Sequence, residues 1–307
     1  MRKLVAYFAV AAGLFMTPGL AAAAEAKLGP VEAKNVTTGK AALDPALSYI
    51  FIQAPNRIFG TFLRVPDEAT RAEYQKDWEE AFEKAKKKHI GAMRSWQSQV
   101  DIAKRTKSKV LEAPTEPTRE TFRIESIDLR DQVSFGPMFV FDKSETRYTY
   151  LNAVKPGTYI YYGMMMVGPA VPAAGSCNCM GTVKFEVKPG MVTDLGNFLY
   201  AGPQPAPPYD YATIEGTRRA EERKAKGKSE LFPTQQVAFG LPETLTWPSA
   251  RAEFHAGGKL NNYYGLPITR LAPIPGVLGY RRDKVIDLRT GTEVESPTIY
   301  TQGKIKK

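Results

Sequence analysis

Cys177 and Cys179 stand one residue apart in the segment SCNCMG and are the only cysteines of the chain. In an oxidising compartment such residues form disulfides. A bridge across a single residue needs a bent backbone that brings the two Cα atoms close together. The flanking glycines, Gly175 and Gly181, permit that bend. We therefore predict a disulfide between Cys177 and Cys179, with free thiols or a bridge to another chain as the alternative states.

Sulfur side chains also lie on both sides of this loop. If the flanking strands pair as a hairpin, thiolates and thioethers converge at one end of it, and soft sulfur ligands select Cu(I). Met165 is excluded from such a site, because successive strand residues point to opposite faces. Methionine is also an ordinary filler of cores, and a disulfide would exclude Cu(I) from the same sulfurs. The ligands of this alternative metal site would be Cys177, Cys179, Met164, Met166 and Met180.

Other residue types that support catalysis are sparse. His89 and His255 are the only histidines, and most zinc hydrolase sites need a third. The sequence holds no G-x-S-x-G motif, no phosphate-binding G-x-x-x-x-G-K-[ST] motif and no dinucleotide fingerprint. The paired carboxylates Glu79-Glu80 and Glu221-Glu222 lie in charged segments that are typical of solvated helix faces. We therefore predict no catalytic residue and no cofactor, with an unrecognised envelope hydrolase as the alternative.

Tyrosines are concentrated in one region of the chain. Exposed on a sheet, they would form a surface on which sugars stack, but tyrosine is also a good strand former that packs against its neighbours. The pattern favours packing. The residues concerned are Tyr148, Tyr150, Tyr159, Tyr161 and Tyr162, with Tyr263 and Tyr264 further along.

Short strands must position these residues. Pro156-Gly157 and Pro189-Gly190 are type II turn signatures, in which proline takes the second position and glycine accepts a positive φ at the third. Strands at this spacing, separated by turn residues, predict an antiparallel β-sandwich. The expected strands are residues 48–53, 57–65, 121–129, 133–141, 147–151, 158–166, 182–188 and 191–195.

A helical insertion interrupts the strands at residues 67–112. Proline is absent between Asp67 and Leu111, and apolar residues recur at steps of three and four. They form a stripe that we expect to be buried against itself, the sheets or a partner, because soluble monomers rarely expose so large an apolar patch. The stripe consists of Tyr74, Trp78, Phe82, Ala85, His89, Met93, Trp96, Val100 and Ala103.

The insertion is predicted to be a helical hairpin that breaks at Gly91. Cations followed by glycine are typical of a helix C-terminus, and Lys86, Lys87 and Lys88 precede this glycine. Few residues follow Leu111 to bring the chain back along one long helix. In a hairpin, Trp78 and Trp96 would approach each other across the two helices. A single helix is the alternative, since the stripe keeps its phase through Gly91.

One part of the chain resembles a known group of proteins. The runs YLNAVKPGTYIYYG and GTVKFEVKPGMVTDLGNF are similar to segments of uncharacterised secreted bacterial proteins. Their small domains resemble the transthyretin-like sandwich of carboxypeptidase regulatory modules. The resemblance covers residues 46–200, with the helical stretch as an insertion. It implies a β-sandwich fold and no site residues, because the shared pattern is one of turns and strands.

The rest of the chain divides by composition. Arg2 and Lys3 precede the apolar run LVAYFAVAAGLFM, and small residues end at Ala24, so residues 1–24 are predicted to be a cleavable signal peptide. That run is too short to span a bilayer, and we expect a periplasmic protein that does not span the membrane. A polar lead follows at residues 25–45. Residues 201–307 are expected to be a Pro-rich linker and a C-terminal arm that wraps the sandwich, or a small subdomain.

The overall charge of the chain indicates which chemical class of partner to expect. The formal net charge is +10, which favours anionic partners such as lipopolysaccharide or acidic glycans. The alternative is a basic surface that only keeps the protein soluble. Nucleic acid is not expected as the partner of an exported protein. The fold class predicted is α+β, an antiparallel β-sandwich with a long helical insertion. The function predicted is that of an exported, non-enzymatic periplasmic accessory or binding protein for an envelope component, with a Cu(I)-binding protein as the alternative.

Overall fold

The computed structural model describes residues 27–110, 112–168, 171–203, 218, 221–222, 225–227 and 234–295. Within them the protein combines one long helix, α2 (Glu68–Thr106), with several mostly antiparallel sheets, and no sheet closes into a barrel. This confirms the expected α+β class. The predicted signal peptide, residues 1–24, lies outside the described residues, as does most of the Pro-rich stretch that begins at residue 201.

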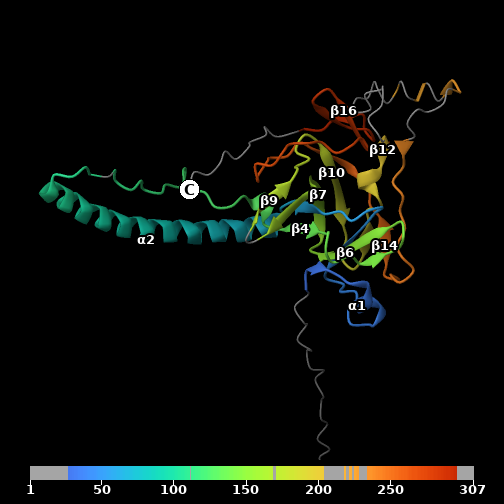
Figure 1. The fold of residues 1–307 in the computed structure, drawn as a ribbon, viewed down its shortest axis with the longest axis horizontal. Helices are drawn as coiled ribbons and strands as arrows, with labels where there is room; N and C mark the ends of the chain where they lie inside the picture. Colours follow the sequence, from blue (N-terminus) through green and yellow to red (C-terminus); the bar gives the residue numbers. More distant parts are fainter. Residues whose placement is uncertain are drawn as a thin grey trace, which may run out of the picture.

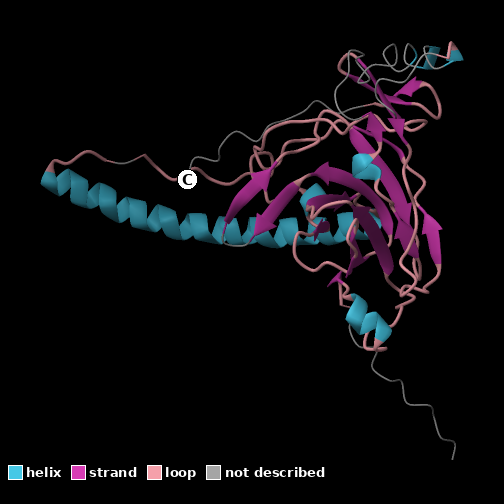
Figure 2. Ribbon diagram, turned by 45° about the vertical axis from the view of Figure 1, so that its right-hand side comes forward, coloured by secondary structure: helices cyan, strands magenta, loops and turns pink. Residues whose placement is uncertain are grey.

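Two larger sheets form the body of the molecule (Figure 2). Sheet 1 contains, in spatial order, β1 (Gly29–Pro30), β6 (Tyr148–Val154), β2 (Ser48–Ala54), β11 (Val192–Asp194) and β14 (Ser249–Arg251), and β5 (Asp142–Lys143) also pairs with β6. Sheet 2 contains β15 (His255–Gly258), β10 (Thr182–Val187), β7 (Gly157–Gly163), β3 (Gly60–Arg64) and β4 (Gln132–Phe135). All pairings in these sheets are antiparallel except those of β11, which runs parallel to β2 and β14.

Smaller elements surround this body. The short helical segments are α1 (Ala33–Thr37), η1 (Ile127–Leu129) and η2 (Phe198–Tyr200). The minor sheets pair β8 (Met165–Gly168) with β9 (Val171–Gly175), β12 (Gly202–Pro203) with β13 (Thr234–Gln235), and β16 (Leu278–Arg281) with β17 (Lys284–Asp287) and β18 (Thr292–Glu293).

The main core draws on both large sheets. Ile52 of β2 and Tyr150 of β6 belong to one hydrophobic cluster with Phe62, Tyr161 and Phe185 of sheet 2. The Phe62 ring lies 5.5 Å from both the Tyr161 and the Phe185 ring. Residues near the C-terminal end enter the same cluster, including Phe254, Leu278 and Tyr280. The described C-terminal residues therefore share the core of the sheets.

The predicted hairpin is wrong, because α2 is a single helix that continues through Gly91 (Figure 1). Its N-cap is Asp67, whose side chain accepts a hydrogen bond from the Thr70 amide at 2.8 Å. It ends at Thr106, and its C-cap, Lys107, has a left-handed backbone with φ 53°. Gly91 is exposed and no side chain near it caps a new helix. The cations before Gly91 therefore lie in mid-helix and do not mark a terminus.

Residues 112–126 return along α2 without regular structure and residues 127–129 form η1, where a strand over residues 121–129 was expected (Figure 1). Tyr74 of the helix donates a hydrogen bond to the Glu125 carbonyl at 3.0 Å, which places the two segments side by side. About 20 extended residues reach roughly 65 Å, which matches a helix of about 58 Å. A hairpin would be needed only if residues 121–129 were a strand of a sheet, because the return along one long helix would then be too short.

The apolar stripe is therefore covered along only part of its length. Phe82 and Ala103 are buried, and its other members are half-buried. Trp78 and Trp96 lie about 27 Å apart on one helix, so they do not approach each other as the hairpin predicted.

Candidate functional site

The most distinctive feature of the molecule is the long excursion between β3 and β4. These strands are neighbours in sheet 2, with Leu63 opposite Gln132. The chain leaves the sheet after Arg64 and re-enters it at Asp131, and the Arg64 amide donates to the Asp131 carbonyl at 3.3 Å. We call residues 67–126 the projection. It extends from one side of the body in both views (Figures 1 and 2).

A buried arginine fastens the projection to the sheet. The Arg64 side chain is 8% exposed and donates four hydrogen bonds. Its Nε bonds the Pro156 carbonyl at 2.8 Å, and Nη1 bonds Thr70 Oγ1 at 3.0 Å and Asp131 Oδ2 at 3.2 Å. Nη2 bonds the Asp67 carboxylate at the start of α2. One guanidinium thus connects β3 with the first turn of α2, with the residue that precedes β4 and with the turn that precedes β7.

The surrounding charges strengthen this joint. The Thr70 amide and then the Arg64 guanidinium hold the pKa of Asp67 well below its ordinary value. Arg130 lies beside the exit of the projection and pairs with Asp77 of α2 at 2.7 Å and with Glu73 at 3.7 Å. The hydrogen bond to Asp77 raises the pKa of Arg130. The base of α2 is therefore held to the body from two sides.

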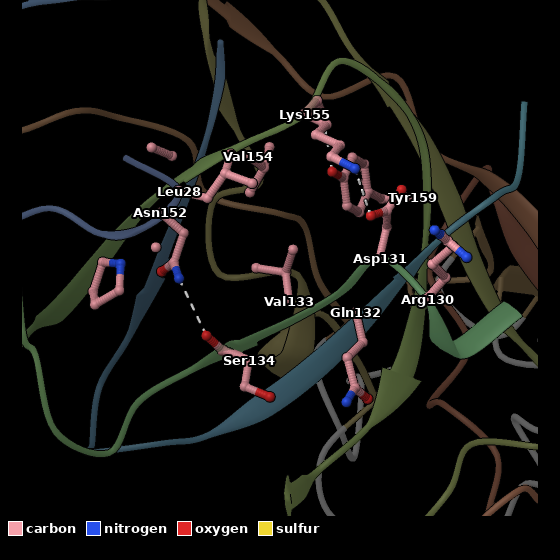
Figure 3. Close-up of a pocket in the computed structure, with 13 residues that line it drawn as sticks. Leu28, Arg130, Asp131, Gln132, Val133, Ser134, Asn152, Val154, Lys155 and Tyr159 are labelled. Carbon is pink, nitrogen blue, oxygen red and sulfur yellow. Dashed lines mark hydrogen bonds and ion pairs between the residues drawn. The ribbon is translucent and has the colours of Figure 1, made fainter. Parts of the chain in front are cut away.

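A groove of about 290 Å³ opens next to the joint, between the ends of β4 and β6 (Figure 3). Lys155 Nζ lies 2.8 Å from Asp131 Oδ1, and Asn152 Nδ2 donates to the Ser134 carbonyl at 3.1 Å. Tyr159 donates to the Lys155 carbonyl at 2.8 Å, and burial raises its pKa. Polar groups of the groove thus bond to one another, which favours a role in holding the joint over one in catalysis.

Aromatic stacking holds the return segment against the proximal part of the projection. The Phe122 ring packs 5.7 Å from the Trp78 ring and 5.5 Å from the Phe82 ring. The Arg119 guanidinium lies 5.5 Å from both helix rings and pairs with both carboxylate oxygens of Glu79 at 2.8 Å. Most of the proximal carboxylates therefore have partners within the chain.

The distal part of the projection, which we define as residues 84–116, has the opposite character. It contains nine lysines and arginines against three carboxylates, whereas residues 67–83 contain two such cations and seven carboxylates. Lys86 pairs with Glu83 at 3.0 Å. The other distal cations are exposed, and none has an ion-pair partner among the described residues. They are Lys84, Lys87, Lys88, Arg94, Lys104, Arg105, Lys107 and Lys109.

This separation of charge was missed at the sequence level. The net charge of +10 does not show where on the surface the cations lie, and the helical periodicity of residues 67–112 indicates only the apolar stripe. The signal was present, since carboxylates crowd the segment before Glu83 and lysines crowd the segment after it. Which charges remain unpaired, however, depends on contacts between distant parts of the chain. Arg130, for example, pairs with Asp77 and Glu73, which lie more than 40 residues before it.

The predicted cysteine pair is buried at the end of β9. Cys177 and Cys179 are both 0% exposed, their sulfur atoms lie at disulfide distance, and their Cα atoms are 5.1 Å apart. They pack with Tyr162 and Met165 in a small hydrophobic cluster. Met165 is the methionine that the copper hypothesis set aside.

Unlike the two buried cysteines, the methionines of the alternative copper site are exposed or half-buried. Met164 and Met166 are each 44% exposed, and Met180 is half-buried. No group of three or more His, Cys, Asp and Glu side chains among the described residues could hold a metal ion.

The histidines lie on separate elements. His89 is half-buried on α2. His255 of β15 faces Asp287, with Nδ1 3.9 Å from Oδ2, and its Nε2 lies 3.2 Å from Arg289 Nη1.

The expected packing role of the tyrosines is confirmed for four of them. Tyr150, Tyr159, Tyr161 and Tyr162 are each at most 1% exposed, so they cannot form a stacking surface for sugars. Tyr263 donates to Asp128, and Tyr264 donates to Gln132 at 2.6 Å. These two tyrosines hold the segments that flank the exit of the projection.

Comparison with protein-family models, with curated proteins and with solved structures found no match to this chain. Within the described part of the chain, no helix combines the length and apolar character that crossing a membrane requires.

Proposed function

We propose that this protein is an exported, non-enzymatic accessory or binding protein of the bacterial envelope, and that it contacts an anionic partner through the distal part of the projection. One observation carries the proposal: most carboxylates near the base have partners within the chain, whereas every distal cation except Lys86 lacks an ion-pair partner among the described residues. Unpaired charges of one sign attract an oppositely charged partner over several ångströms.

The joint supports this function mechanically. A helix of this length places its end about 58 Å from its start, and the bonds of Arg64 and Arg130 fix its direction at the body. A protein built in this way presents its cations at a distance from its sheets. The proposed role of the body is to carry the projection and fix its base.

We further propose that sheets 1 and 2 form an antiparallel sandwich of the transthyretin-like kind. The shared core of Ile52, Phe62 and Phe185 supports it, as do the antiparallel pairings of β2, β6, β7 and β10. An experimental structure, compared strand by strand with that fold, tests the assignment. A different strand connectivity would refute it.

The binding role is tested by sedimenting the purified protein with washed bacterial envelope fragments. The variant Lys84→Gln/Lys87→Gln/Lys88→Gln should lose most of this binding. A control of equal charge change, Lys34→Gln/Lys40→Gln/Lys76→Gln, alters exposed lysines outside the distal part and should retain it. Equal binding by both variants would refute the role of the projection.

The non-enzymatic and exported character have tests of their own. Turnover of envelope glycans or esters, abolished by one serine or carboxylate substitution, would overturn the first. Recovery of the expressed protein in the periplasmic fraction, with its N-terminus at Glu25, is expected for the second. Uncleaved protein in the cytoplasm would contradict it.

A further inference from the structure

The arrangement of the distal cations indicates what kind of anion they bind. Lys84, Lys87, Lys88 and Arg94 are distributed around the side of α2 that lies away from the apolar stripe. They do not converge on a pocket. A discrete anionic ligand needs several donors directed at one point, whereas charges spread along and around a rod suit an extended surface of smeared negative charge.

The exposed apolar residues of the same segment help to distinguish a lipid surface from a polysaccharide as the anionic partner. Ile90 is 54% exposed and Ile102 is 59% exposed, and both lie among the cations. Val110, beyond the helix end, is 40% exposed. Branched aliphatic side chains gain free energy by entering the boundary between lipid headgroups and acyl chains. The same side chains gain little free energy by contact with a hydrated polysaccharide.

The predominance of lysine over arginine among the distal cations is consistent with a lipid bilayer as the partner. Seven of the nine distal cations are lysines. Lysine acts as a point charge on a flexible apolar stem, which extends along an interface while its ammonium group stays among headgroups. Recognition of a defined sulfate or carboxylate favours the planar fork of arginine.

A purely structural explanation covers only some of these cations. Lys104 and Arg105 lie in the last turn of α2, where cations stabilise the helix dipole. Lys84, Lys87 and Lys88 are in mid-helix, where the dipole has no such effect, and they lack ion-pair partners among the described residues. These three lysines are therefore the informative ones to change.

We infer that the distal part of the projection, residues 84–116, adsorbs to the surface of an anionic lipid bilayer, with its lysines among the headgroups and Ile90 and Ile102 at the interface. The inference rests on the proposed function, since it names the partner of the same surface. The body is then held away from the bilayer by the proximal part of the projection.

Vesicle binding by the full chain tests this inference. Vesicles of phosphatidylglycerol and phosphatidylcholine in equal parts should bind the protein, and vesicles of phosphatidylcholine alone should not. The Lys84/Lys87/Lys88→Gln variant should bind the anionic vesicles about 100-fold more weakly, because each lysine near such a surface contributes about fivefold. The Lys34/Lys40/Lys76→Gln control should bind close to the wild type, and added salt should weaken all binding.

A second variant, Ile90→Gln/Ile102→Gln, separates lipid from other polyanions. It changes no charge, and both positions are exposed, so the helix should persist with unchanged circular dichroism. It should weaken vesicle binding and leave any binding of dextran sulfate unaltered.

Three results would overturn the inference: no binding to anionic vesicles, equal weakening by the distal and control variants, or vesicle binding that Lys84/Lys87/Lys88→Gln leaves intact. If vesicles fail while envelope fragments still bind through the distal lysines, the lipid assignment is wrong and the proposed function stands. If both fail, the proposed function fails as well.

Discussion

Arg64 connects more of the molecule than any nearby side chain described above. Removing its guanidinium leaves Asp131, which is 15% exposed, without one of its partners. Breaking a buried ion pair from one side costs about 3 kcal/mol or more. We therefore expect Arg64→Ala to lower the free energy of unfolding by about that amount and to speed hydrogen exchange in the first turns of α2.

Arg71 provides the matched control for this prediction. It lies on the first turns of the same helix, is exposed, and has no ion-pair partner among the described residues. Arg71→Ala should change stability by less than about 0.5 kcal/mol. An Arg64→Ala protein as stable as this control would show that the joint is not an important contact.

Asp67 should make stability depend on pH in the acid range. Its pKa is lowered in the folded protein by the Thr70 amide and the Arg64 guanidinium, so its ionised form stabilises the fold above the unfolded pKa of about 4. That stabilisation is lost as the pH falls through the lowered folded pKa. Asn caps helices about as well as Asp, so Asp67→Asn removes mainly the charge. Urea unfolding at several pH values should show the difference between wild type and Asp67→Asn shrink below about pH 4; a constant difference would contradict this.

The cysteine pair should resist reduction in the folded protein. Both residues are fully buried, and thiol–disulfide exchange requires access of the attacking thiolate to sulfur. Native protein should show no free thiol, with or without reductant, and two free thiols once it is unfolded in reductant. Two reactive thiols in native, non-reduced protein would contradict the disulfide.

Residue spacing predicted those contacts that are local. The C-N-C pair was predicted from two residues and their neighbouring glycines, and the packing role of the tyrosines was predicted from strand patterns. Arg64 could not be singled out, because its partners Pro156 and Asp131 are separated from it by 92 and 67 residues. Nothing in the sequence near Arg64 indicates which distant groups fold against it.

At the level of elements, Gly91 distinguishes one helix from two. Its backbone is not left-handed, and an added Cβ would meet nothing within 4 Å. Gly91→Ala should therefore stabilise α2 by about 0.5–1 kcal/mol. Slower hydrogen exchange around residues 85–100 is the expected result.

Replacing glycine by alanine at Gly190 should have the opposite effect on stability. Gly190 lies in the turn between β10 and β11 with φ 68°, and alanine is strained there. Gly190→Ala should therefore destabilise the protein. If Gly91→Ala also destabilised it, the hairpin that the sequence suggested would be favoured again.

Periodicity predicted the helix well, from Asp67 to within a few residues of its end at Thr106. The same reasoning failed for residues 121–129, where alternating polar and apolar residues resemble a strand. Residues 121–126 lie beside α2, where Phe122 packs on Trp78 and Phe82, and residues 127–129 form η1. An extended chain that covers a helix has the same alternation as one that pairs in a sheet, so the pattern alone could not distinguish them.

For the molecule as a whole, the shared core predicts cooperative unfolding. Phe254 is 5% exposed, and its ring lies 5.8 Å from that of Phe185 and 5.3 Å from that of Phe198. Phe254→Ala should destabilise the entire body by about 3–5 kcal/mol, and tryptophan fluorescence and circular dichroism should report one coincident urea transition. Ser249→Ala, at an exposed position on β14, is the control. Two separate transitions would show that the C-terminal region folds independently.

The position of the projection between two adjacent strands has a consequence for its reach. Because β3 and β4 pair with each other, the register of sheet 2 does not depend on how many residues lie between Arg64 and Asp131. Two further helical turns would lengthen the projection by about 10 Å, and about three more residues would suffice for the extended return. The projection is thus a spacer whose length can change while its attachment to sheet 2 stays the same. Its reach can be reset by paired insertions in the two segments while every hydrogen bond of Arg64 is preserved.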